Sequence, residues 1–104
     1  MTGIVDAPLE TIIDRLHALA PALKAVGVTR LCLFGSRARG EARPGSDLDV
    51  LVDTTVQGTQ PAFDYFKVLH LIEDDIGLPV QVTQRALLKP RVVERIADDV
   101  IEVF

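Results

Sequence analysis

The residues best suited to chemistry are a Gly-Ser pair and the aspartate pair that follows it. An apolar strand that breaks at Gly35 and Ser36 and turns into a short helix directs backbone N–H groups and a hydroxyl beyond the strand end, where anions bind. After a spacer of ten residues, Asp47 and Asp49 alternate along a second predicted strand, so their side chains share one face about 6–7 Å apart. Mg²⁺ is usually held by one or two carboxylates together with substrate phosphates. The spacing therefore predicts a phosphate-sized anion site beside a metal site.

The two aspartates also have a simpler reading. Asp47 would then be a turn residue at the start of the strand, and Asp49 an exposed strand residue. However, aspartate is disfavoured in strands, and two like charges at alternate positions cost stability unless a cation lies between them. We therefore assign both as metal ligands and catalytic carboxylates. Asp53 has the same parity but lies about 13 Å beyond Asp49 along a strand, so we expect it at the start of a loop.

Two arginines follow the Gly-Ser pair at the start of the predicted motif helix. Cations there oppose the helix dipole, at a cost of about 0.3–1 kcal/mol each. A bound triphosphate would turn that cost into attraction. We favour phosphate contact by Arg37 and Arg39 over the alternative of two solvated arginines balanced by Glu41. The expected nucleotide-binding residues are therefore Gly35, Ser36, Arg37 and Arg39.

The pattern of Gly-Ser, ten residues and Asp-x-Asp resembles the signature of the minimal nucleotidyltransferases of the DNA polymerase β superfamily. It is similar in particular to the small antitoxin partners of HEPN ribonuclease toxins. The similarity includes Arg37-Ala38-Arg39-Gly40 and Ser46, and it extends more loosely over most of the chain. The resemblance implies transfer of a nucleoside monophosphate, AMP from ATP, to a hydroxyl of a partner protein or nucleic acid. It also implies Mg²⁺ as cofactor, as one or two ions, and a HEPN-type toxin as partner.

One position departs from the family pattern. Relatives usually carry a third carboxylate on the strand after the middle helix, and here the corresponding stretch Leu78–Thr83 has Gln81. A carboxylate there would help hold the metal and activate the acceptor hydroxyl, whereas glutamine has no charge and is no useful base. The resemblance therefore implies an incomplete acidic triad. Two functions stay open, an active nucleotidyltransferase and a nucleotide- or partner-binding module without chemistry.

Composition limits the class of protein. At 104 residues, with 48% hydrophobic and 25% charged residues, the chain is expected to form one domain over 1–104 with a substantial core. A net charge of -4 argues against a general nucleic-acid coat and favours a basic protein partner, so direct nucleic-acid binding is not expected. No apolar run approaches the roughly 18 residues of a membrane span, and the N-terminus lacks a basic region, so we expect a cytoplasmic protein. Cys32 stands alone, and we expect a small buried strand residue rather than a reactive thiol.

The elements that position these residues follow from apolar spacing. A helix is predicted from about Ala7, with a break at Pro21 and a short second turn that stops at Gly27. Strands are predicted at 28–34, 47–53 and 78–83, a loop at 54–60, helices from Pro61 to Gly77 and at 86–97, and a strand or helical tail at 100–104. This order predicts an α/β fold of the α+β kind, a mixed sheet with helices packed against it. The resemblance sharpens that to the nucleotidyltransferase core.

Overall fold

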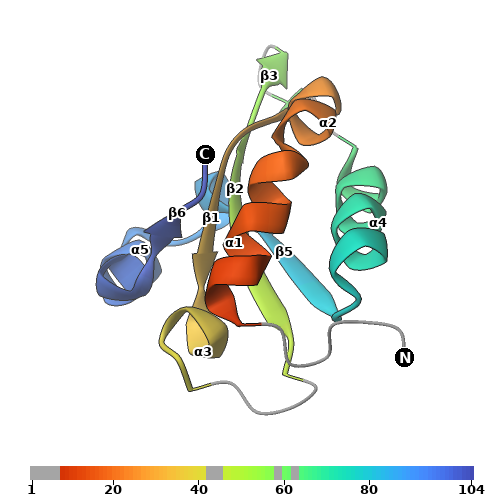
Figure 1. Cartoon of the computed structure of the whole chain (residues 1–104). Helices are drawn as coiled ribbons and strands as arrows, with labels where there is room; N and C mark the ends of the chain where they lie inside the picture. Colours follow the sequence, from red (N-terminus) through yellow and green to blue (C-terminus); the bar gives the residue numbers. More distant parts are fainter. Residues whose placement is uncertain (1–7, 42–45, 58–59, 62–63) are drawn as a thin grey trace.

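The computed structural model describes residues 8–41, 46–57, 60–61 and 64–104. The strands of its main sheet are β1 (Val28–Phe34), β2 (Leu48–Thr54), β5 (Val80–Gln84) and β6 (Ile101–Glu102). They lie in the order β5-β2-β1-β6 (Figure 1). Strand β2 is parallel to β5 and antiparallel to β1, and β6 is antiparallel to β1. The prediction of a mixed sheet is confirmed.

The helices of the described ranges are α1 (Leu9–Ala18), α2 (Ala20–Ala25), α3 (Gly35–Ala38), α4 (Tyr65–Ile76) and α5 (Pro90–Ile96). Two 3₁₀ turns, η1 (Arg85–Leu87) and η2 (Ala97–Asp99), flank α5. Two short strands, β3 (Val56–Gln57) and β4 (Gln60–Pro61), pair separately from the main sheet. In this part of the chain, every helix is too short or too polar to cross a membrane.

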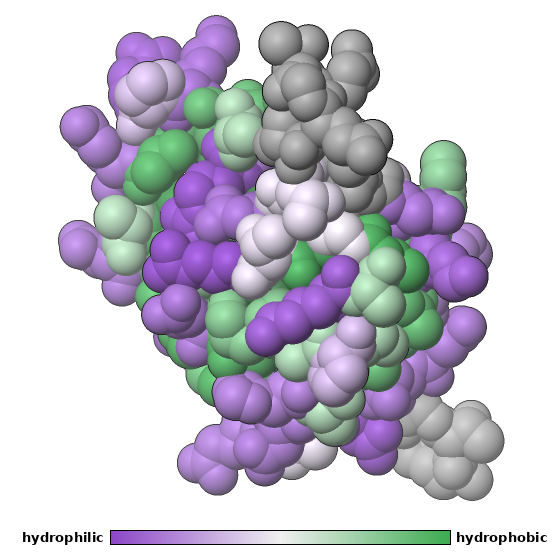
Figure 2. Space-filling model, turned by 90° about the horizontal axis from the view of Figure 1, so that it is seen from above, coloured by the Kyte–Doolittle hydropathy of each residue, from purple (hydrophilic) through white to green (hydrophobic). Residues whose placement is uncertain are grey.

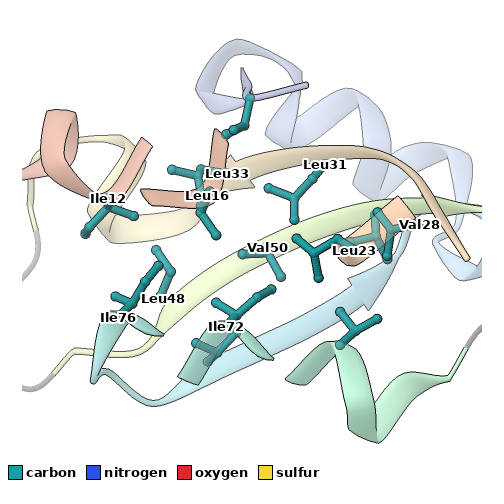
Figure 3. Close-up of a cluster of buried hydrophobic side chains, with 14 of the residues drawn as sticks. Ile12, Leu16, Leu23, Val28, Leu31, Leu33, Leu48, Val50, Ile72 and Ile76 are labelled. Atoms are coloured by element: carbon teal, nitrogen blue, oxygen red, sulfur yellow. The ribbon is translucent and has the colours of Figure 1, made fainter. Parts of the chain in front are cut away.

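One hydrophobic core lies between the sheet and the helices α1, α2 and α4 (Figure 3). Alternation along β2 directs Leu48, Val50 and Val52 toward it. The helices contribute residues at three- and four-residue spacing, as amphipathic helices on a core do. These buried helix residues are Ile12, Leu16, Leu23, Val68, Ile72 and Ile76. Because burial of each such side chain stabilises the fold by about 1.5–3 kcal/mol, this core fixes which face of the sheet is left for Asp49.

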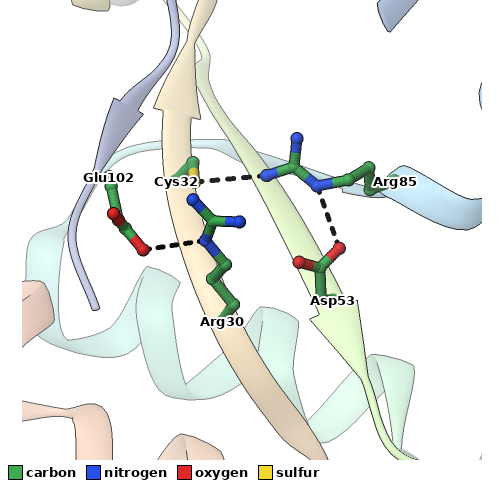
Figure 4. Close-up of polar contacts among 5 residues, drawn as sticks. All are labelled: Arg30, Cys32, Asp53, Arg85 and Glu102. Carbon is green, nitrogen blue, oxygen red and sulfur yellow. Dashed lines mark hydrogen bonds and ion pairs between the residues drawn. The ribbon is translucent and has the colours of Figure 1, made fainter.

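Polar contacts tie the strands together on the opposite face of the sheet. Arg85 follows β5 and donates from Nε to Asp53 Oδ1 at 3.0 Å and from Nη2 to Cys32 Sγ at 3.4 Å (Figure 4). Arg30 donates from Nε to Glu102 Oε2 at 2.8 Å, which joins β1 to β6. Cys32 is fully buried, as predicted. The segment that starts at Arg85 and joins the two edge strands is therefore held to the sheet at both of its ends.

Two predicted boundaries around the middle helix are wrong. The predicted loop over 54–60 contains the strand end of β2 and the β3–β4 hairpin, and Pro61 lies in β4 rather than at a helix start. Helix α4 begins at Tyr65 because Asp64 caps it, with Oδ1 accepting a hydrogen bond from the Lys67 N–H at 3.1 Å. Gly77, with φ of +79°, ends the helix as predicted.

Other boundaries also differ. The helix predicted over 86–97 is divided, because Pro90 fits the first turn of a new helix and not the interior of a continuous one. Asp53 lies inside β2 and not at a loop start. The first helix begins at Leu9, and Ala7 lies outside the described residues. The tail forms strand β6, which was one of its two predicted alternatives.

The cap of α4 gives a first test. Replacement of Asp64 by alanine removes the acceptor for the Lys67 N–H and should destabilise the fold by about 1 kcal/mol. Asp64→Asn keeps a capping oxygen and serves as the matched control, with nearly unchanged stability. Urea denaturation monitored by circular dichroism measures both. Equal stability of the alanine variant and wild type would contradict the assigned helix start.

Candidate functional site

The turn from β1 into α3 packs directly against Asp49. Gly35 has φ of +80°, a conformation that residues with a side chain rarely adopt. A Cβ on Gly35 would overlap the Asp49 carboxylate oxygen and would lie 3.0 Å from its Cγ. The register explains this proximity, because Phe34 and Asp49 are partners in the β1–β2 pairing. The structure thus brings together the Gly-Ser turn and the aspartate that the sequence analysis identified.

The two aspartates differ in environment. Asp47 is exposed just before β2, whereas Asp49 is partly buried within it. The pKa of the Asp49 carboxyl is raised above its ordinary value, first by burial and then by the charge of Asp47, while Arg39 acts in the opposite direction. Burial and repulsion both penalise the charged form of Asp49. A cation near the two carboxylates would relieve the repulsion between them.

Gln81 lies beside Asp49 in the parallel pairing of β2 and β5. Neighbouring strands are about 4.8 Å apart, and register partners direct their side chains to the same face. Gln81 is exposed. An uncharged amide therefore stands next to Asp49, at the position where a third carboxylate was expected from the family resemblance.

Arg37 is buried in α3, with 7% of its surface exposed. Its Nε and Nη2 donate to the carbonyl oxygen of Ser46 at 3.0 and 2.9 Å. Because Ser46 immediately precedes Asp47, the guanidinium links the motif helix to the start of β2. Sequence reasoning missed this contact, since every residue offers a backbone carbonyl and none is marked by its side chain. Phosphate contact by Arg37 stays a prediction.

Arg39 is exposed and takes part in two ion pairs. Its Nε donates to Glu41 Oε1 at 2.8 Å, and its Nη1 lies 3.6 Å from Asp99 Oδ2. Glu41 was the partner named in the alternative reading, whereas nothing in the sequence pointed to Asp99 of η2. Exposed pairs of this kind are worth only about 0–1 kcal/mol, so Arg39 is able to exchange them for phosphate oxygens. Its contact with phosphate also stays a prediction.

Ser36 is partly buried in the first turn of α3. The residue at the cap position of α3 is Phe34 and not Ser36, and no side-chain hydrogen bond caps this helix. Its backbone carbonyl accepts from the Glu41 N–H at 2.8 Å, which closes the short helix. The structure therefore gives the hydroxyl no capping role, and phosphate binding by Ser36 stays a prediction.

The donor groups can be compared with what a metal requires. The described ranges contain no group of three or more histidine, cysteine or acidic side chains that could hold a metal ion. The carboxylates of Asp47 and Asp49 are hard oxygen donors, and they repel each other. Mg²⁺ keeps several waters and binds through one or two carboxylates plus substrate phosphates. The residues fit a metal that a nucleotide helps to hold and do not fit a closed structural site.

A separate surface cavity of about 450 Å³ lies between the end of α1 and α4. It is on the helical side of the sheet, away from Gly35 and Asp49, and its lining is of mixed charge and polarity. The lining residues are Leu19, Lys67, His70, Leu71, Asp74 and Asp75. This cavity shares no residue with the site described above.

Comparison with known proteins identifies the family. A family model described as a nucleotidyltransferase domain matches residues 9–103. The chain belongs to this nucleotidyltransferase family. A Methanocaldococcus jannaschii protein named as a candidate protein adenylyltransferase is 35% identical over 78 residues, which cover 73% of this chain and 77% of that protein. The protein adenylyltransferase MntA of Thermococcus cleftensis is 30% identical over 77 residues, covering 74% and 76%.

Solved structures agree with the family assignment. A structure described as a candidate minimal nucleotidyltransferase is 32% identical, has a TM-score of 0.75, and covers 92% of this chain and 96% of its own. A toxin-antitoxin crystal structure with AMP-PNP has a TM-score of 0.67 at 14% identity, covering 88% of this chain and 72% of that one. At that identity the second likeness shows the fold alone. The resemblance to minimal nucleotidyltransferases is confirmed.

Gly35 offers a test of the packing against Asp49. Gly35→Ala introduces both backbone strain and overlap with the carboxylate. Backbone strain alone should destabilise the fold by roughly 1–2 kcal/mol, and the overlap should make the loss of stability larger. Gly40→Ala is the matched control, because Gly40 has φ of +75° with nothing within 4 Å of an added Cβ. In an Asp49→Ala background the difference between the two glycine variants should shrink, because alanine lacks the carboxylate and keeps only the Cβ, which lies 3.2 Å from the added Cβ. Urea denaturation of all combinations measures it, and equal losses in the wild-type background would contradict the close contact.

The raised pKa of Asp49 predicts the pH dependence of stability. A group whose pKa is higher in the folded state stabilises the fold at low pH, and this contribution is lost as the pH rises through the folded-state pKa. With EDTA present to remove metals, Asp49→Asn should therefore be more stable than wild type at pH 7. The difference in stability should become small below about pH 3, where the wild-type carboxyl is protonated in both the folded and the unfolded state. Denaturant titrations across this range measure the effect. A variant that is less stable than wild type at pH 7 would contradict the assigned environment of Asp49.

Proposed function

We propose that this chain is a Mg²⁺-dependent nucleotidyltransferase that moves AMP from ATP to a hydroxyl group of a partner protein or nucleic acid. The observation that carries this proposal is the contact of Asp49 with the Gly35 backbone. It sets a carboxylate suited to a metal beside a turn suited to phosphates. Family membership and the names of two relatives support adenylyl transfer.

Substrate binding in this proposal uses the motif helix. Backbone N–H groups of Gly35 and Ser36, with the Ser36 hydroxyl, bind phosphate oxygens. Arg39 exchanges its exposed ion pairs for the triphosphate, whose higher charge attracts it more strongly. Arg37 contributes positive charge from its buried position. Asp47 and Asp49 would hold Mg²⁺, and the bound ion would neutralise the charge that develops on the phosphates.

The proposed reaction is a displacement at the α-phosphorus of ATP. The acceptor oxygen forms a bond to that phosphorus, the bond to the oxygen bridging the β-phosphate breaks, and pyrophosphate leaves. The acceptor hydroxyl loses its proton, which a base or water must accept. Gln81, next to Asp49, carries an amide that cannot take this proton. Removal of the proton from the acceptor hydroxyl is therefore the step for which this site is least well equipped.

The position of Gln81 also supports a second candidate function. A chain with Asp47 and Asp49 but no third carboxylate keeps the groups for nucleotide binding and loses one for chemistry. Such a chain would act as a nucleotide- or partner-binding module of the same fold. The two functions differ in whether label from ATP is transferred, not in whether ATP binds.

The proposed partner is a HEPN-type toxin, with this chain as its cytoplasmic antitoxin. A structural neighbour described as a toxin-antitoxin complex supports this, through the fold alone. The net charge of -4 favours a basic partner. Tyr65 and Phe66, 37% and 70% exposed, give the start of α4 an aromatic surface suited to protein contact.

The surface seen from above carries no single broad apolar area among the described residues. Figure 2 shows hydrophobic residues in small groups among hydrophilic ones. Interfaces that form and dissociate are about as apolar as the rest of a protein surface. A transient partner therefore needs no broad apolar area on this face.

Label transfer from ATP tests the proposed function. Wild type, Gln81→Asp, and Gln81→Asp with Asp49→Asn are incubated with α-labelled ATP, Mg²⁺ and candidate toxin proteins. Because a positioned general base typically contributes about 10²–10⁴-fold, Gln81→Asp should raise transfer by about tenfold or more, and the added Asp49→Asn should abolish it. Wild-type transfer that Gln81→Asp leaves unchanged or lowers would show that another group activates the acceptor. Binding of ATP without transfer by any variant would favour the binding module.

A further inference from the structure

Arg37 and Arg39 leave the motif helix in different directions. Arg37 is buried, and two of its nitrogens donate to one backbone carbonyl, that of Ser46. Arg39 is exposed and lies among the carboxylates of Glu41 and Asp99. Arg39 also acts on Asp49, lowering its pKa against the effects of burial and Asp47. Two arginines that look equivalent in the sequence are therefore in different environments.

The acceptor of Arg37 is well placed to control the aspartates. Ser46 precedes Asp47, and its carbonyl belongs to the peptide group that leads into Asp47. Fixing that carbonyl at two donors restricts rotation of this peptide. Three residues further on, Asp49 is already held by its pairing with Phe34 and Gln81. Asp47 lies before β2 and has no strand partner in these pairings, so it depends most on the contact made by Arg37.

We propose that Arg37 is a positioning residue that holds the peptide before Asp47 and so sets the distance between the two carboxylates, while Arg39 contacts the phosphates. The inference rests on the proposed function, because it requires that Asp47 and Asp49 bind the metal. Direct phosphate contact by Arg37 is the competing role. It would require the guanidinium to turn from the Ser46 carbonyl, or to reach phosphate from a site that is 7% exposed.

Two ligands, each measured alone, separate the roles. Mn²⁺ replaces Mg²⁺ as a spectroscopic probe and is titrated without nucleotide, with free Mn²⁺ followed by electron paramagnetic resonance. ATP is titrated in EDTA by calorimetry, so that phosphate contacts are measured without the metal. The variants are Arg37→Met, Arg37→Lys and the matched control Arg39→Met, each first checked for folding by circular dichroism.

A positioning role predicts that Arg37→Met weakens Mn²⁺ binding by roughly tenfold, the lower end of the effect of removing a residue that orients metal ligands. Its affinity for metal-free ATP should stay within about twofold of wild type, as expected when no phosphate contact is lost. Arg39→Met should show the opposite pattern. Arg37→Lys keeps the charge but not the paired donors, so it should also weaken Mn²⁺ binding, to a smaller extent. Lysine thereby tests the role even if the methionine variant does not fold.

The contrary results are equally specific. Unchanged Mn²⁺ affinity with weakened ATP binding, in either Arg37 variant, would overturn the positioning role and assign Arg37 to the phosphates. Unchanged affinity for both ligands would overturn it as well. A wild-type protein that does not bind ATP even when Mn²⁺ is present would refute the proposed function itself, and the role of Arg37 with it.

Discussion

The contact between Gly35 and Asp49 is the constraint on which the rest of the site depends. Antiparallel pairing brings the end of β1 to the start of β2, and a glycine with φ of +80° lets the chain turn into α3 without displacing the carboxylate. The core fixes this register, because a slip by one residue would turn Asp49 inward and Val50 outward. Packing on the core face of the sheet therefore determines that Gly35 and Asp49 lie together on the other face.

The same arrangement leaves the unliganded protein with an electrostatic cost. Asp49 is partly buried and repelled by Asp47, and Arg39 offsets this only in part. Ionisable groups with perturbed pKa values cluster at functional sites, where a bound ligand stabilises the charged form. The raised pKa of Asp49 therefore supports a functional role for this site. Arg37 is also a buried charge, and its two hydrogen bonds to the Ser46 carbonyl oxygen fix the backbone next to Asp47. We read the site as one prepared for a cation and phosphates together.

The sequence predicted well those features that depend on local pattern. Strand β1 has its predicted bounds because a largely apolar segment stands between Gly27 and Gly35, both of which have positive φ. The mixed sheet followed from the order of elements. Helix starts were less predictable, since Pro61 and Asp64 are both plausible first-turn signals and only the β3–β4 hairpin decides between them.

For the site, spacing identified the Gly-Ser turn and the aspartates but not their neighbours. The contact of Arg37 with Ser46 uses a backbone carbonyl, which has no signature in the sequence. The approach of Asp99 to Arg39 depends on the path of the whole C-terminal segment. The position of Gln81, on the other hand, agrees with the family pattern, because the register of β2 and β5 pairs it with Asp49 although the two are far apart in the chain. What sequence alone lacks is the tertiary arrangement that gives each arginine its partner.

The most direct test of this account is a crystal structure with Mn²⁺ and an ATP analogue in which a methylene group replaces the α,β-bridging oxygen. Anomalous scattering locates the metal without ambiguity. The account predicts manganese bound by the carboxylates of Asp47 and Asp49, with the triphosphate over Gly35 and Ser36. Nucleotide bound elsewhere, for example in the cavity between α1 and α4, or manganese that contacts neither aspartate, would contradict it.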